Sequence, residues 1–193
     1  MKRLLFFLIA ICFFPQVNLA PAQASMSAPV AALFDSETIL DITLKSEMKV
    51  LFSDIGDERA YHPASLAYVS ETGMPLTVAA ELRTRGNFRR QRNVCNLPPI
   101  RVKINPNEAA GTLFADQKKL KLVTVCQYKK DQYEQNLLME YLSYRAYNLL
   151  TDSSFRVRLA RITFIDIHGS MDTIRRCGFF IEDEDQMASR LGG

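Results

Sequence analysis

Residues 131–150 read DQYEQNLLMEYLSYRAYNLL, and this stretch decides the fold class because it is the one long helix that the sequence predicts. Asp131 is followed three residues later by Glu134, which is the spacing of a capping box with Asp131 as the N-cap residue. Side chains on one face then recur at helical spacing, and most of them are apolar. They are Leu138, Tyr141, Leu142, Arg145 or Ala146, and Leu149. We therefore expect a helix from Asp131 that buries this face and ends at residues 151–154.

Short apolar runs on both sides of this helix predict strands. They lie at residues 38–44, 64–69, 76–85, 100–104 and 120–125 before the helix, and at 157–167 and 173–181 after it. Glu71-Thr72-Gly73 is a turn signal that joins two of them as a hairpin, and residues 186–191 form a last short helix. The order of strands, helix and strands predicts an α+β domain over residues 38–193, an antiparallel sheet with one long helix.

The N-terminus has the features of a cleavable secretory signal. Lys2 and Arg3 precede an apolar run at residues 4–14, and Ala22-Gln23-Ala24 offers the small side chains of a cleavage site. The signal is therefore expected to span residues 1–24, and a linker to follow at 25–37.

Two alternatives stay open at this end of the chain. Cleavage could instead follow Ala20 or Ala22, or the segment could stay attached as an anchor. The anchor is the poorer reading, because the apolar run is shorter than the roughly 20 residues that cross a bilayer as a helix. We expect a secreted or periplasmic protein of the cell envelope, with no membrane span once the signal is removed.

The overall charge does not indicate a partner, but its distribution is uneven. The chain has 24 Lys and Arg against 21 Asp and Glu, and two of the bases leave with the signal. Residues 35–81 hold nine acidic residues, whereas residues 83–130 hold twelve basic residues against Glu108 and Asp116. A basic block of this kind attracts anions or forms a well-solvated face.

The cysteines predict one disulfide. Cys12 leaves with the signal, and of the remaining three we expect Cys95 to pair with Cys126, since each lies just outside an apolar segment that can form neighbouring strands. Cys177 is then the odd thiol. With no C-x-x-C spacing and only His62 and His168 available, no metal site is expected.

The basic block contains the candidate binding residues. The chain lacks G-x-S-x-G, H-E-x-x-H, Walker-type and G-x-G-x-x-G motifs. Alternate residues of a strand share one face, so three neighbouring strands would gather basic side chains into a patch suited to phosphates. The alternative is a solvated sheet face with no ligand. The paired side chains are Arg83 with Arg85, Arg101 with Lys103, and Lys119 with Lys121.

Several of these motifs occur in one order that resembles a known family. Arg83-x-Arg85-Gly86-Asn87-x-x-Arg90 is followed by Pro98-Pro99-Ile100-Arg101-Val102-Lys103, Lys119-Leu120-Lys121-Leu122, Asn136-Leu137-Leu138-x-x-Tyr141 and an aromatic hairpin that ends at Glu182. This order resembles the spore coat protein H (CotH) kinase-like family, in particular its exported bacterial branch. The resemblance covers residues 64–193.

The resemblance implies the N-terminal lobe of an atypical protein-kinase-like fold, which grips nucleotide phosphates. Lys103 would be the phosphate-binding lysine, with Lys121 as its rival, and Glu140 on the long helix would pair with it. Arg83 and Arg85 would be further phosphate or structural contacts. A solvated helix carboxylate is the alternative role for Glu140.

The family's catalytic and metal-binding aspartates would lie in a second lobe, beyond residue 193. The resemblance therefore implies a truncated, phosphotransferase-related chain that is inactive alone, with ATP and Mg²⁺ as cofactors of a full-length relative and none for this chain. The alternative function is a non-catalytic envelope module whose basic patch binds an anionic small molecule or envelope component. Nucleic acid is poorly supported as a partner, because Phe88 is the only aromatic residue among the arginines.

Overall fold

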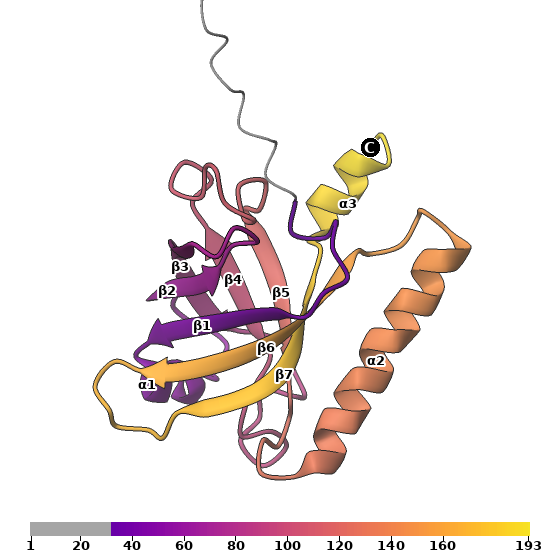
Figure 1. Ribbon diagram of the computed structural model, residues 1–193. Coiled ribbons are helices and arrows are strands. Elements are labelled where there is room, and N and C mark those ends of the chain that lie inside the picture. Colours follow the sequence, from indigo (N-terminus) through magenta and orange to yellow (C-terminus); the bar gives the residue numbers. More distant parts are fainter. Residues whose placement is uncertain (1–31) are drawn as a thin grey trace, which may run out of the picture.

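Seven strands form a closed barrel in the computed structural model, which describes residues 32–193 (Figure 1). Around the barrel the strands follow the order β1-β2-β3-β4-β5-β7-β6, and β6 pairs with β1. The elements in chain order are β1 (Leu40–Ser46), α1 (Met48–Ser53), β2 (His62–Val69), β3 (Pro75–Thr84), β4 (Ile100–Ile104), β5 (Lys119–Thr124), α2 (Asp131–Leu150), β6 (Val157–Asp166), β7 (Ile174–Ile181) and α3 (Glu184–Arg190).

The barrel closes through a parallel pair, β1 with β6, in which Ile42 lies beside Ile162 and Leu44 beside Phe164. The predicted fold class, an antiparallel sheet with one long helix resembling a kinase-like N-terminal lobe, is therefore wrong. Alternation of apolar residues indicates which face of a strand points inward. It carries no information about which distant strand lies alongside, so the pairing of the first strand with the sixth could not be inferred from it.

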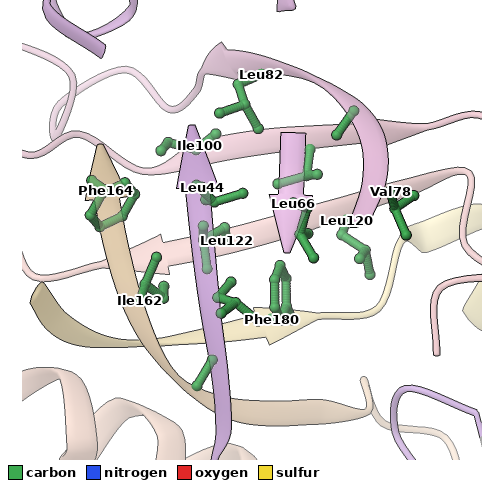
Figure 2. Packing of buried hydrophobic residues seen from close by; sticks show 14 of the residues in the cluster. Leu44, Leu66, Val78, Leu82, Ile100, Leu120, Leu122, Ile162, Phe164 and Phe180 are labelled. Carbon is green, nitrogen blue, oxygen red and sulfur yellow. The ribbon is translucent and has the colours of Figure 1, made fainter. Parts of the chain in front are cut away.

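Alternate strand residues point into the barrel and fill it, as small barrels require (Figure 2). The labelled members of this core are Leu44, Leu66, Val78, Leu82, Ile100, Leu120, Leu122, Ile162, Phe164 and Phe180. Phe114, from the connection between β4 and β5, packs edge-on against Tyr68 and Phe180, with ring centroids 5.6 and 6.0 Å apart. Apolar packing thus holds the strands from within and leaves their outer faces for other roles.

Helix α2 lies against the outside of the barrel and contacts β6 and β7 (Figure 1). Its buried residues are Leu137 and Tyr141, which pack in a second apolar cluster with Phe179. The predicted core face of this helix is wrong in part, because Leu142 and Leu149 are 55% and 84% exposed.

The predicted capping box of α2 is also wrong. Lys130 is the N-cap residue, Asp131 and Glu134 lie in the first turn, and no side chain caps the helix. Acidic residues in the first turn still favour the helix through its dipole.

The end of the predicted linker packs on the barrel. Leu33 is fully buried, and Arg158 of β6 donates hydrogen bonds to the Leu33 carbonyl (3.2 Å) and to Thr38 Oγ1 (3.0 Å). The predicted signal at 1–24 and the linker up to residue 31 lie outside the described residues.

Helix α1 was not predicted, because the side chain that caps its N-terminus belongs to Asp166, a residue distant in sequence. Its own N-cap residue, Glu47, makes no side-chain cap bond. Instead the carboxylate of Asp166, at the end of β6, accepts hydrogen bonds from the backbone N–H of Lys49 (3.2 Å) and of Ser170 (2.8 Å). Asp166 thus ties α1 to the β6–β7 connection.

These bonds predict a pH dependence of stability. The Ser170 N–H above all, and the other backbone N–H groups, lower the pKa of Asp166 from its ordinary 3.8. A carboxylate with a lowered folded-state pKa stabilises the fold above its ordinary pKa, and this contribution is lost as the pH falls below it. In urea unfolding across the acid range, Asp166→Asn is therefore expected to lose stability less steeply than the wild type below about pH 4. The exposed Asp172→Asn is the control, and equal slopes for all three proteins would contradict the prediction.

Candidate functional site

Three basic side chains lie next to one another on the outer faces of β3, β4 and β5. Arg83 of β3 is the cross-strand partner of Arg101 of β4, and Arg101 is the partner of Lys121 of β5. Like charges directly opposite each other repel and destabilise a sheet. This row therefore needs counter-charges from elsewhere in the fold.

Helix α3 supplies two of these counter-charges. Asp183, its N-cap residue, accepts from Arg101 at 3.3 Å, and Glu184 in its first turn contacts Lys121 at 2.5 Å. Lys121 is largely buried, with its Nζ 4.5 Å from the centre of the Phe155 ring. The two carboxylates at the start of α3 thus offset the positive charges of Arg101 on β4 and Lys121 on β5.

Helix α2 supplies a third carboxylate, to the loop that follows β3. Arg89 in this loop lies 3.6 Å from Glu140 of α2 and donates a 2.7 Å hydrogen bond to the carbonyl of Thr124. Glu140 therefore pairs with an arginine of the loop and holds it between α2 and the end of β5.

Arg85 lies among these pairs and has no counter-ion of its own. Its backbone N–H donates to the Pro99 carbonyl at 2.8 Å, but its guanidinium makes no hydrogen bond or ion pair within residues 32–193, and its Nε is buried. Burial lowers the pKa of Arg85, and the charges of Arg101 and Arg89 lower it further, while Glu184 opposes them. We call Arg85, Arg89, Arg101 and Lys121 the Arg85 cluster.

The other residues suggested by sequence have partners outside this cluster, although Arg83 lies directly opposite Arg101 on the neighbouring strand. Arg83 stacks on the ring of Tyr61, with its guanidinium carbon 4.4 Å from the ring centre. Lys103 pairs with Glu81 at 2.6 Å, and this hydrogen bond raises the pKa of Lys103. The pair of Lys103 with Glu140 that the family resemblance implies is not among the ion pairs of residues 32–193.

The sequence placed Arg89 and Arg101 in the basic block, but neither was predicted as a site residue, and the carboxylates of α3 were not predicted to join them. The alternation of β4 contained a signal for Arg101, since it points outward with Lys103. The pairing of Asp183 and Glu184 with β4 and β5 had no such signal, because it depends on where α3 docks.

The predicted disulfide is confirmed: Cys95 is bonded to Cys126, and Cys177 remains a free thiol. Burial and a hydrogen bond to Glu134 raise the pKa of Cys177 to about 11, so it is protonated at neutral pH. Within residues 32–193, no group of three or more His, Cys, Asp or Glu side chains is placed to hold a metal ion.

None of the helices that the structure describes combines the length and the apolarity needed to cross a membrane. The resemblance to the CotH kinase-like family stays a prediction. Comparisons of the chain with family models, with curated proteins and with solved structures found no match.

Proposed function

We propose that this chain is an exported binding module that holds an anionic group at the Arg85 cluster. One observation carries the proposal: Arg89, Arg101 and Lys121 each have a carboxylate partner, whereas Arg85 between them has none in the part of the chain that the structure describes. Export rests on the signal-like residues 1–24, and the disulfide is consistent with an oxidising compartment.

The charges of the site favour an incoming anion. The four cations of the cluster face three carboxylates, those of Glu140, Asp183 and Glu184. A partly buried guanidinium is destabilised by its like-charged neighbours, and an anion that binds it removes this cost. Arginine suits this role because its planar fork binds a carboxylate or phosphate through two hydrogen bonds.

The position of the cluster gives the anion a defined place to bind. Arg85 follows the last residue of β3, and Glu184 is the carboxylate whose charge acts on the pKa of its guanidinium, opposing the effect of Arg101 and Arg89. Arg101 and Lys121 stand on β4 and β5, and their carboxylate partners stand at the start of α3, so these polar groups of the cluster are held by regular structure. Rigid elements position ligand groups better than mobile loops do.

The test is binding of inorganic pyrophosphate, read from NMR chemical shifts of the backbone amides near Arg85. Arg85→Gln is expected to weaken binding about tenfold or more, since a hydrogen bond to a charged group contributes about 1.5–3 kcal/mol. The affinity is expected to fall with added salt and not to require Mg²⁺.

The matched control is Arg175→Gln, which removes the same charge from an exposed arginine of β7 that pairs with Asp41. It is expected to leave pyrophosphate binding nearly unchanged. Equal weakening by both variants would mean that only the overall charge attracts the anion, and the proposal would then fail.

A further inference from the structure

An apolar groove adjoins the Arg85 cluster. It has a volume of about 370 Å³ and lies between the second half of α2, the connection to β6, and α3. Its large side chains are Tyr144, Tyr147, Phe155 and Met187, and serines complete the lining. Figure 1 shows α3 and the last turns of α2 at the same end of the molecule.

Two residues of the groove lie close to cations of the Arg85 cluster. The ring of Phe155 has Lys121 Nζ 4.5 Å from its centre. Tyr144 lies near enough to Arg85 for the charge of the arginine to act on the pKa of its hydroxyl, which burial raises and Arg85 lowers. The groove is therefore apolar along its walls and cationic where it meets β3 and β5.

We propose that the groove and the Arg85 cluster form one site for an anionic amphiphile, a single alkyl chain with a carboxylate or phosphate head. This inference rests on the proposed function and names the class of ligand. The head would lie at Arg85 and Lys121, and the chain would lie along Tyr144, Tyr147 and Phe155. The volume is near the lower end of the roughly 300–1,000 Å³ of ligand pockets, which suits one chain rather than two.

Glu184 occupies part of the position proposed for the head. Its carboxylate contacts Lys121 at 2.5 Å, and although burial raises the pKa of Glu184, the hydrogen bond from Lys121 and the charges of Lys121 and Arg101 lower it overall. The side chain is 57% exposed and stands in the first turn of α3, so it can turn into solvent when a ligand carboxylate replaces it. Glu184 is therefore a competitor of the ligand, and its removal is expected to strengthen binding.

The experiment is a calorimetric titration of the full chain, as the cell exports it, with alkanoates from butanoate to decanoate, below their micellar concentrations. Each added methylene is expected to lower the dissociation constant about twofold to fourfold until the groove is full, since burying one CH₂ contributes ~0.8 kcal/mol. Decyl phosphate, titrated in parallel, distinguishes a lipid phosphate from a fatty-acid carboxylate. Tighter binding of either one supports the inference and identifies the head.

Three variants separate the two halves of the site. Arg85→Gln is expected to weaken every member of the series by a similar factor, about tenfold. Tyr147→Ser, at a side chain that is 56% exposed and so tolerant of change, is expected to flatten the dependence on chain length. Glu184→Gln is expected to tighten binding severalfold, and Arg175→Gln is the control that should do neither.

The outcomes distinguish this inference from the proposed function. If butanoate and decanoate bind equally and both still depend on Arg85, the amphiphile is wrong and the anion site stands. If uncharged octyl glucoside binds as tightly as octanoate, the groove acts without the cluster and the inference is overturned. Loss of the Arg85 dependence for pyrophosphate as well would overturn the proposed function.

Discussion

Replacement of Cys95 and Cys126 together by alanine is expected to lower the free energy of unfolding by about 3 to 4 kcal/mol. The bond joins residues 31 apart, and a cross-link over a loop of this length removes much conformational entropy from the unfolded chain. The bond also anchors the loop that carries Arg89, because Cys95 lies in this loop. Next to the bond, the Cys126 carbonyl accepts hydrogen bonds from the N–H groups of Asn96 and Leu97. Denaturation in urea, monitored by circular dichroism, measures the loss.

The control for this variant is Cys177→Ser, which removes the free thiol and leaves the bond. If the double variant cannot be purified, reduction of the folded wild type with dithiothreitol gives the same comparison. A double variant within about 0.5 kcal/mol of the wild type would show that the bond does not constrain the unfolded chain.

Gly178→Ala is expected to destabilise the protein by about 2 to 3 kcal/mol, because the barrel has no room for a side chain there. A Cβ at this position of β7 would overlap Ile162 Cδ1 of β6 and lie 2.8 Å from the carbonyl oxygen of Val123 of β5. In a closed barrel the strands on both sides of β7 are held by their own neighbours, so neither can shift without disturbing the rest. Urea unfolding again gives the measurement.

A double variant tests the cause of this effect. Ile162→Val removes Cδ1, the atom nearest to the new methyl, and leaves the Val123 carbonyl in place. Gly178→Ala combined with Ile162→Val is therefore expected to be more stable than the sum of the two single effects predicts. Gly56→Ala is the control, since its Cβ would meet only the Glu58 carbonyl at an ordinary 3.9 Å. Strict additivity of the two changes would show that the overlap with Ile162 is not the cause.

The sequence predicts the elements of this fold better than their arrangement. The two ends of each predicted strand lie within two residues of the ends of an observed strand. Such strands can be predicted because the alternation of apolar and polar residues is a local pattern along the chain. The disulfide followed from the same reasoning, since strands β4 and β5 are neighbours in space as well as in sequence. Structure that depends on residues close together in the sequence could thus be predicted from the sequence pattern.

What could not be predicted depends on contacts between distant parts of the chain. The seam of β1 with β6, the cap of α1 by Asp166, and the counter-charges that α3 brings to β4 and β5 all join segments far apart in sequence. The candidate site likewise has a part that the sequence predicted and a part that depends on contacts between distant segments. Most of its cations were visible as alternating strand residues, whereas the isolation of Arg85 appears only when Arg89, Arg101 and Lys121 are each seen to have a carboxylate partner.

Closure of the barrel also limits how this protein can associate with others. An open sheet presents a row of unpaired backbone N–H and C=O groups at each edge, and such an edge accepts a strand from another chain. Here each of the seven described strands has a neighbour on both sides. Addition of a foreign strand to this sheet would first require two paired strands to part, so the closed barrel disfavours association through edge-to-edge strand pairing.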